Sequence, residues 1–115
     1  MDYKQRYAIL ASNKAKIRKA FPTITDDCGI YILTREEDGI KYAYIGQSLH
    51  VWTRLAEHLA GYQHIDLSLK KHGFYGVDNP TGYNIWQIFC AKDKLDEKEQ
   101  FYIRKYANAG YQLRN

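Results

Sequence analysis

The sequence contains little cysteine and little proline, with two of each among 115 residues. Cys28 and Cys90 lie 62 positions apart, which gives neither a disulfide framework nor the paired spacing of a zinc site. The sequence also shows no signal-peptide pattern and no apolar run of membrane length. These absences argue against a secreted, disulfide-stabilised or membrane-bound protein. We expect a cytoplasmic protein with reduced thiols and no membrane partner.

Acidic residues are nearly absent from the start of the chain, where Asp2 is the only one before residue 26. Residues 3–20 have the spacing of a helix, whose apolar stripe would comprise Tyr7, Leu10, Ile17 and Phe21. Its other faces carry the basic residues Lys4, Arg6, Lys14, Lys16, Arg18 and Lys19. This charge fits either the solvated face of a covering helix or a phosphate-tracking surface, with Lys14, Arg18 and Lys19 as candidate nucleic-acid contacts. Pro22 ends the helix, so we expect residues 1–27 to form a basic helix and linker packed on a domain of residues 28–115.

Tyrosine, in contrast, is abundant: the chain has eleven, together with a net charge of +4 at pH 7. Aromatic and basic surfaces suit a polar, anionic partner, most often nucleic acid. Two of the tyrosines lie in a predicted hairpin, because residues 28–35 and 40–46 both alternate with the period of a strand. A four-residue loop of residues 36–39 would pair Arg35 with Ile40 and place Tyr31 directly opposite Tyr44. One face of the hairpin would then be aliphatic, and the other would carry paired phenols.

A helix is predicted after the hairpin, with Ser48 as its N-cap and Gly61 as its stop. Its buried stripe would comprise Trp52, Leu55, Ala56 and Leu59. Arg54 and His58 are four residues apart on roughly the opposite face, so we expect their side chains to project away from the packing of the helix. The two phenols, the arginine and the histidine would then converge.

The rest of the chain predicts one more strand and two more helices. Residues 64–72 favour a short helix that ends at Gly73, although their alternation also allows a strand. Residues 73–82 form a loop, and Tyr83–Ala91 would form an apolar strand in the centre of the sheet. A last helix, capped by Asp93, would run to about Ala107. The length suits one domain with a single core.

Glu99 is the acidic residue that helical periodicity places among the apolar positions of the last helix, which are Leu95, Tyr102, Ile103 and Tyr106. Burying a carboxylate is costly unless it is paired or bound to a cation. Three explanations stay open: a structural salt bridge, with Arg54 as the partner, several accepted hydrogen bonds, and a metal ligand. A single carboxylate would suit a weakly held, largely hydrated Mg²⁺.

The tripeptide Gly29-Ile30-Tyr31 is followed by Tyr44-Ile45-Gly46, then by Arg54 and His58, and finally by Glu99 in a late helix. This order and spacing resemble the GIY-YIG nuclease family over residues 28–112. The resemblance implies a compact α/β (α+β) domain with a small three-stranded antiparallel sheet flanked by helices. It also implies Mg²⁺- or Mn²⁺-dependent hydrolysis of DNA phosphodiesters, with Glu99 as metal ligand and Arg54 steadying charge on the phosphate. Tyr31 and Tyr44 would position or activate the water, and His58 would assist.

Two positions depart from the pattern of many family members. Gln47 stands where they carry Lys after the second tripeptide, and Gly110-Tyr111-Gln112 stands where they close with Gly-Tyr-Asn. Gln47 keeps a hydrogen-bond donor without the charge, and either Gln112 or Asn115 would supply the amide for substrate positioning. We expect both changes to affect the rate of DNA cleavage more than the type of reaction. Lys70 and Lys71 are further candidates for contacting a backbone phosphate.

These residues predict an Mg²⁺-dependent DNA endonuclease that uses no small-molecule cofactor. Two other classes stay open: a nuclease-like domain that binds nucleic acid without cutting it, and a small structural partner in a larger complex. The chain stops soon after Gly110, which is compatible with a missing C-terminal region. The DNA target, the strand preference and the oligomeric state do not follow from the sequence.

Overall fold

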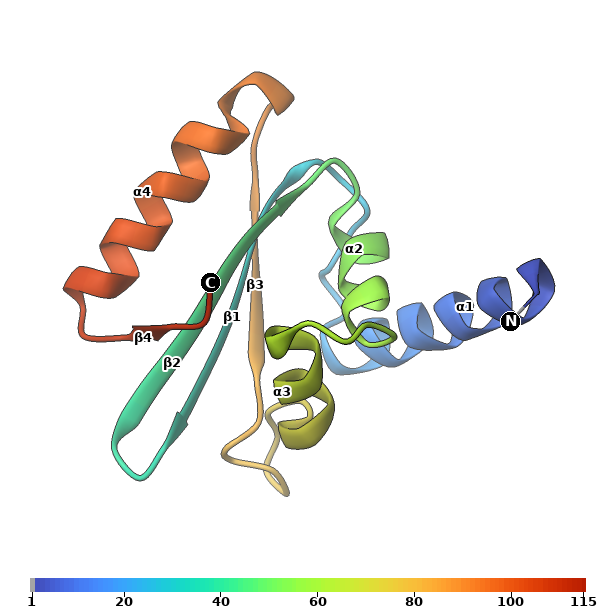
Figure 1. The fold of residues 1–115 in the computed structure, drawn as a ribbon, viewed down its shortest axis with the longest axis horizontal. Coiled ribbons are helices and arrows are strands. Elements are labelled where there is room, and N and C mark those ends of the chain that lie inside the picture. The colour runs from blue at the N-terminus through green and yellow to red at the C-terminus, as the bar shows by residue number, and fades with distance from the viewer. Residues whose placement is uncertain (1) are drawn as a thin grey trace.

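A sheet with the strand order β3-β1-β2-β4 organises the chain. The computed structural model describes residues 2–115, with these elements in chain order: α1 (Tyr3–Ala20), β1 (Gly29–Glu37), β2 (Ile40–Ser48), α2 (Val51–His58), α3 (His64–His72), β3 (Asn84–Phe89), a 3₁₀ turn (Lys92–Lys94), α4 (Leu95–Asn108) and β4 (Gln112–Leu113). Figure 1 shows α4 on one side of the sheet and α1, α2 and α3 on the other. The mixed α+β fold is confirmed, whereas the predicted count of three strands is wrong because the sheet has four.

The additional strand, β4, has only two residues and therefore carries no sequence pattern of its own. It pairs in parallel with β2, where Gln112 lies opposite Tyr42 and Leu113 lies opposite Ala43. The pairing continues past the strand, because the Arg114 N–H donates to the Ala43 carbonyl at 2.8 Å. The chain end thus lies along the outer edge of β2.

The third predicted strand, β3, lies at an edge of the sheet, so its predicted central position is wrong. It pairs with β1 in an antiparallel ladder, and its Ile85 is buried on the side of α2 and α3. On the other face Trp86 is 54% exposed. Helix α4 packs mainly against β2 and β1, which leaves this part of β3 more open to solvent. Apolar composition alone does not distinguish such an edge strand from a central one.

The hairpin turn between β1 and β2 is tighter than predicted. Asp38 and Gly39 form a two-residue turn with φ values of 54° and 78°, the positive values that a type I′ turn requires. Glu37 therefore pairs with Ile40, and Tyr31 lies opposite Gly46 rather than Tyr44. The predicted four-residue loop is wrong because Asp-Gly is itself a preferred two-residue turn. The register moves by two residues, so every side chain keeps its predicted face.

The alternation of side chains along the hairpin creates two cores. Towards α4, Ile30 and Ile32 pack with Ala43, Ile45 and Leu95. Towards α1, α2 and α3, the phenolic face packs with apolar residues of these helices, and this core includes Ile17, Tyr31, Leu33, Val51, Leu55, Ala56, Ile65 and Leu69. Both predicted faces of the hairpin are present, and the phenolic face is the one that meets α2 and α3.

Helix α1 has the predicted bounds, but Tyr7 does not belong to its buried stripe because it is 67% exposed. The short helix α2 contacts α1 around Asn13, whose Nδ2 donates to the Ala56 carbonyl at 3.1 Å. The N-terminal end of α1 extends beyond this contact, as Figure 1 shows. Residues 64–72 form the helix α3, so the alternative of a strand is wrong there.

The starts of α2 and α4 differ from the prediction. His50 rather than Ser48 is the N-cap of α2, and the Ser48 hydroxyl instead accepts from the His50 N–H at 3.0 Å. Asp93 lies within the 3₁₀ turn that precedes α4, and Lys94 is the N-cap of that helix. Neither α2 nor α4 has a side-chain hydrogen bond at its N-cap, which explains why the capping patterns placed the boundaries wrongly.

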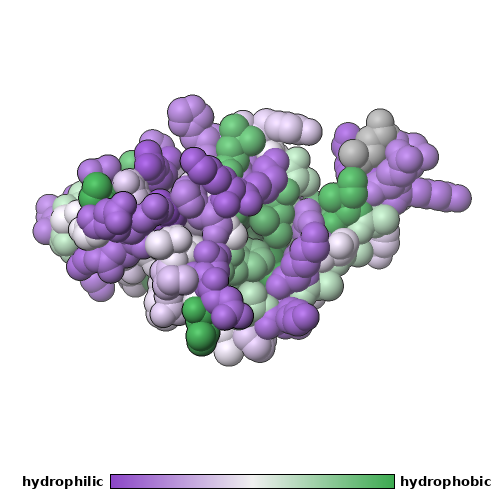
Figure 2. Space-filling model, turned by 90° about the horizontal axis from the view of Figure 1, so that it is seen from below, coloured by the Kyte–Doolittle hydropathy of each residue, from purple (hydrophilic) through white to green (hydrophobic). Residues whose placement is uncertain are grey.

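The face of the molecule that is seen from below the orientation of Figure 1 is largely polar. Figure 2, which views the molecule from below the orientation of Figure 1, shows hydrophilic residues over most of this face and hydrophobic residues mainly in a band near its middle. This distribution agrees with the mean hydropathy of −0.58 for the chain. Among residues 2–115, none of the helices combines the length and apolar character that crossing a membrane requires.

Candidate active site

Tyr31 and Tyr44 lie on adjacent strands, on the face of the hairpin that meets α2. Their ring centroids are 6.3 Å apart, although the two residues are diagonal neighbours rather than an opposed pair. Gly46 makes room for the Tyr31 phenol, because a Cβ at this position would lie 2.3 Å from Tyr31 Cζ and 2.4 Å from Tyr31 Oη. Burial raises the pKa of both phenols, and the positive charge of Arg54 opposes this rise. Both phenols are therefore protonated at neutral pH.

His58 is fully buried, with 0% exposure, so the prediction that it projects away from the packing is wrong. That prediction considered α2 alone, whereas the chain after α2 folds back and places α3 against the face that carries His58. The Nε2 atom of His58 lies 2.8 Å from Tyr31 Oη, and its Nδ1 atom lies 2.5 Å from Asp66 Oδ1. Burial lowers the pKa of His58, and the Asp66 carboxylate opposes this effect. The structure thus joins Tyr31, His58 and Asp66 in one buried hydrogen-bonded chain.

Asp66 is a candidate site residue that the sequence prediction missed. It is 4% exposed, and its Oδ2 accepts from the Gln63 backbone N–H at 3.0 Å. Gln63 and Asp66 form a capping box at the start of α3, and their three-residue spacing is the one available sequence signal. A capping box does not require the acid to be buried, so this signal alone does not indicate a role in a site.

Arg54 is half-buried on α2, one turn before His58. Its positive charge lowers the pKa of Tyr31 and Tyr44 against the larger effect of burial, and it also lowers the pKa of His58. Arg54 therefore lies close to all three groups. Among residues 2–115 its guanidinium forms no ion pair with a carboxylate, which leaves it available to an anionic ligand.

Glu99 is half-buried on α4, so its predicted inward position is only partly attained. Its negative charge contributes to raising the pKa of Tyr44. Within residues 2–115 Glu99 forms no salt bridge, and the predicted alternative of an ion pair with Arg54 is therefore wrong. The same part of the chain contains no group of three or more His, Cys, Asp or Glu residues arranged to hold a metal ion. A single free carboxylate fits a largely hydrated Mg²⁺, which commonly binds through one or two carboxylates.

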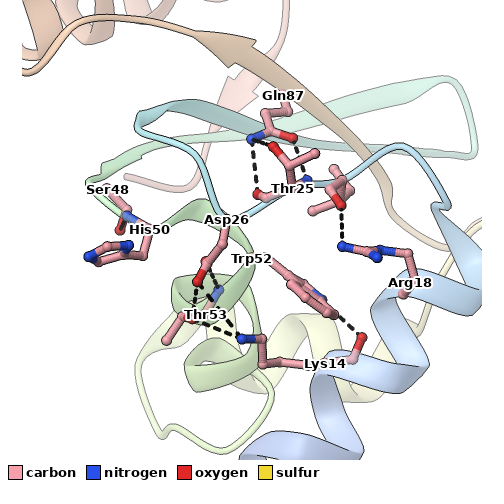
Figure 3. Close-up of polar contacts among 10 residues, drawn as sticks. Lys14, Arg18, Thr25, Asp26, Ser48, His50, Trp52, Thr53 and Gln87 are labelled. Atoms are coloured by element: carbon pink, nitrogen blue, oxygen red, sulfur yellow. Dashed lines mark hydrogen bonds and ion pairs between the residues drawn. The ribbon is translucent and has the colours of Figure 1, made fainter.

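Two of the basic residues predicted to contact nucleic acid fasten α1 to α2, as Figure 3 shows. Lys14 Nζ lies 3.8 Å from Asp26 Oδ2 and 4.3 Å from the centroid of the Trp52 ring. Arg18 Cζ lies 3.9 Å from the same ring, and the Trp52 indole N–H donates to the Lys14 carbonyl at 2.9 Å. Lys19, the third of these residues, is exposed. Lys14 and Arg18 thus have a structural role whether or not they also contact a ligand.

The other predicted nucleic-acid contacts lie at separate places. The Gln47 side-chain amide donates to Asp96 Oδ1 at 2.7 Å and links the end of β2 to α4. Lys70 donates to the Gly61 carbonyl in the turn between α2 and α3. Lys71 lines a cleft of about 410 Å³ between α3 and residues 113–115. The structure therefore separates Gln47, which contacts α4, from Lys70 and Lys71 of α3 on the other side of the sheet.

Gln112 and Asn115, the candidates for substrate positioning, belong to the edge of the sheet. Gln112 of β4 is exposed and pairs with Tyr42 of β2. The Asn115 side chain accepts from the Ile45 N–H at 3.1 Å and donates to the Ile45 carbonyl at 2.6 Å. Asn115 therefore holds the chain end against β2, one residue beyond Tyr44.

A phenol hydrogen-bonded to a buried imidazole, with a guanidinium whose charge acts on both groups, is a set of groups suited to phosphodiester chemistry. The GIY-YIG catalytic domain family matches residues 27–112, which is most of the 115-residue chain. The chain belongs to this family of nucleases, and both family tripeptides and Glu99 fall within the matched range. No curated protein and no solved structure shows a significant match.

Proposed function

We propose that this protein is a divalent-metal-dependent DNA endonuclease that hydrolyses phosphodiester bonds. The observation that carries the proposal is the 2.8 Å hydrogen bond between Tyr31 Oη and the buried His58 Nε2, within a domain of the nuclease family. The family implies a nucleic acid substrate. DNA as that nucleic acid, Mg²⁺ or Mn²⁺ as the metal, and the roles given below belong to the proposal.

In this mechanism, Tyr31 and His58 act together as the proton acceptor. A phenol whose pKa is raised by burial is a poor base when it acts alone. Burial also lowers the pKa of His58, so its imidazole is neutral near pH 7 and can accept a proton. As Tyr31 Oη removes a proton from the attacking water, the phenolic proton of Tyr31 passes to His58 Nε2. Tyr31 then does not have to persist as a buried anion.

Arg54 and Tyr44 stabilise the reacting phosphate. The Arg54 guanidinium can donate two parallel hydrogen bonds to phosphate oxygens, and its charge lies where negative charge develops in the transition state. Tyr44 lies beside Tyr31 and is kept protonated by burial, so its hydroxyl can donate to the water or to a phosphate oxygen. These groups are held by β2 and α2 before the substrate arrives, which avoids reorganisation during the reaction.

Glu99 would hold the divalent metal. Its carboxylate has no ion-pair partner among residues 2–115, and Mg²⁺ tolerates a site with few protein ligands because it retains several waters. When bound, the metal supplies positive charge that polarises the phosphate and stabilises the leaving oxygen.

Nicking of supercoiled plasmid in Mg²⁺, Mn²⁺ or EDTA tests the proposal. The parent protein should nick DNA in either metal and not in EDTA. Glu99→Gln should lose this activity while the free energy of unfolding changes by no more than about 0.5 kcal/mol, because no ion pair is broken. Glu97→Gln is the matched control: it lies on the same helix, and within residues 2–115 its ion pair is an exposed one with Lys94 at 3.8 Å. A Glu99→Gln protein that nicks at the parent rate would contradict the metal assignment.

A domain that binds nucleic acid with weak or no cleavage is the second candidate function. It is favoured by Gln47, which stands where many family members carry a lysine and whose amide is engaged by Asp96. Fluorescence anisotropy with labelled DNA, run beside the nicking assay, separates the two functions. Binding without nicking in either metal would establish the second.

A further inference from the structure

The turn between α2 and α3 is built around the Asp66 carboxylate. Asp66 Oδ1 lies 2.5 Å from His58 Nδ1, and Asp66 Oδ2 accepts from the Gln63 backbone N–H at 3.0 Å. Gly61 leaves room for this carboxylate, because a Cβ there would lie 2.0 Å from Asp66 Oδ2. Asp66 and His58 are 4% and 0% exposed, so water does not compete for these contacts. Both carboxylate oxygens are thus assigned to fixed partners.

This contact decides which nitrogen of His58 carries the proton. An ionised carboxylate can only accept hydrogen bonds, so the His58 nitrogen that faces it must be the protonated one. Nδ1 is therefore N–H, and the lone pair of the neutral ring lies on Nε2. Tyr31 then donates its hydroxyl hydrogen to Nε2 across the 2.8 Å contact. The free lone pairs of Tyr31 Oη are left for a proton from outside this chain of bonds.

The charges around His58 also favour transfer of the Tyr31 proton to Nε2. Charged or titratable groups face the ring from four elements: Arg54 and Glu57 on α2, Asp66 on α3, Tyr31 on β1 and Tyr44 on β2. Burial and Arg54 lower the pKa of His58, which keeps the ring neutral before the reaction, whereas Asp66 and Glu57 raise it. Once a proton arrives from Tyr31, the imidazolium lies against a buried carboxylate and is stabilised by it.

We propose that Asp66 is a positioning residue for the hydrolysis described above: it holds His58 as the Nδ1–H tautomer, so that Nε2 receives the Tyr31 proton. The proposal rests on the proposed nuclease function. Asp66 does not touch the substrate, and it acts through His58. The arrangement resembles in logic the aspartate of a Ser-His-Asp triad, with a phenol in place of the serine hydroxyl.

Asp66→Asn is the most informative variant, because the Gln63 N–H dictates how the new amide lies. The amide oxygen must take the place of Oδ2 to accept that N–H, which turns the NH₂ group towards His58 Nδ1. A donor at this point forces Nδ1 to become the acceptor and moves the ring proton to Nε2. Nε2 can then no longer accept the proton of Tyr31. The shape of the side chain is nearly unchanged, so we expect the fold to be retained.

Long-range ¹H–¹⁵N spectra of the metal-free protein report the tautomer directly, with His58 assigned by comparison with His58→Gln. The parent should show Nδ1–H and Asp66→Asn should show Nε2–H. In the nicking assay, Asp66→Asn should lower kcat by roughly 10²-fold or more with KM nearly unchanged. Asp78→Asn, an exposed change of the same chemistry in the loop before β3, should match the parent in both measurements.

Each outcome decides a specific claim. A parent His58 that is protonated on Nε2 overturns the positioning role without any variant, so the test survives even if Asp66→Asn fails to fold. A folded Asp66→Asn protein with the reversed tautomer and the parent kcat also overturns it, while the nuclease function stands. A parent that nicks no DNA in any metal overturns the nuclease function itself, and with it the catalytic meaning of the tautomer.

Discussion

Gly46→Ala tests whether the space at Gly46 is what allows Tyr31 to reach His58. The added methyl would lie 2.3 Å from Cζ, 2.4 Å from Oη and 2.6 Å from Cε2 of Tyr31. Carbon atoms prefer separations of about 3.5–4.0 Å, so the ring or the strand must move by about 1 Å. Tyr31 is only 2% exposed, and its ring cannot swing into solvent without leaving the core. We expect the displacement to break its 2.8 Å hydrogen bond with His58.

Two effects set the expected loss in the free energy of unfolding of Gly46→Ala. Overpacking a core costs about 1–3 kcal/mol, and leaving a buried polar group without its partner costs about 1–3 kcal/mol more. The free energy of unfolding should therefore fall by about 2–6 kcal/mol, which lowers the Tm by roughly 8–24 °C for a domain of this size. Cleavage should fall as well, because the proton path from Tyr31 to His58 is interrupted.

Thermal unfolding followed by circular dichroism measures the loss of stability. Plasmid nicking at a temperature where both proteins are folded measures the loss of cleavage. Gly76→Ala is the matched control, because a Cβ there would meet nothing within 4 Å. If Gly46→Ala kept the parent Tm and the parent nicking rate, the close approach of Tyr31 to β2 would not be a requirement of the site.

Three further predictions concern Arg54, His58 and the basic helix. Arg54→Lys keeps the charge but loses the planar fork, so nicking should slow by roughly 10²-fold or more with little change in Tm; a parent rate would exclude a bidentate phosphate clamp. The folded-state pKa of His58 lies below its ordinary value of 6.5, so nicking should hold steady down to pH 6.5 and decline at lower pH. Stability should also decrease below pH 6.5, because the unfolded state binds the proton more readily. If the decrease in stability is the same in His58→Gln, another group causes it. Lys14→Ala should lower the Tm because the contact of Lys14 with Trp52 is lost. Lys19→Ala should keep the Tm and reduce the log–log salt slope of DNA binding by about 0.9. An unchanged slope would show that Lys19 does not contact the DNA.

The hairpin shows which features follow from local sequence. Strand alternation places Ile30 and Ile32 on one face and Tyr31 and Tyr44 on the other, and this division survives although the turn is two residues shorter than predicted. It survives because a shift of two residues preserves the face of every side chain. The exact cross-strand partners depend on the turn, and the choice of turn required recognising Asp-Gly as a complete loop.

The candidate site shows which features do not follow from local sequence. The periodicity of α2 predicts that His58 faces away from the apolar stripe, but it contains no information about α3, which covers that face and supplies Asp66. Glu99 could be singled out because an acid among apolar positions violates the pattern of its own helix. Asp66 violates no pattern, since an acid near the start of a helix is ordinary. Its burial arises only when two helices pack together.

β4 and Asn115 cover the outer edge of β2, the strand that carries Tyr44. An uncovered edge strand offers a row of unpaired N–H and C=O groups to which a second chain can add a strand. The Asn115 amide occupies both backbone groups of Ile45, much as a neighbouring peptide unit would. Residues 112–115 therefore protect the outer edge of β2 against strand-to-strand self-association. Deleting residues 112–115 would open an aggregation-prone edge directly beside the proposed cleavage site.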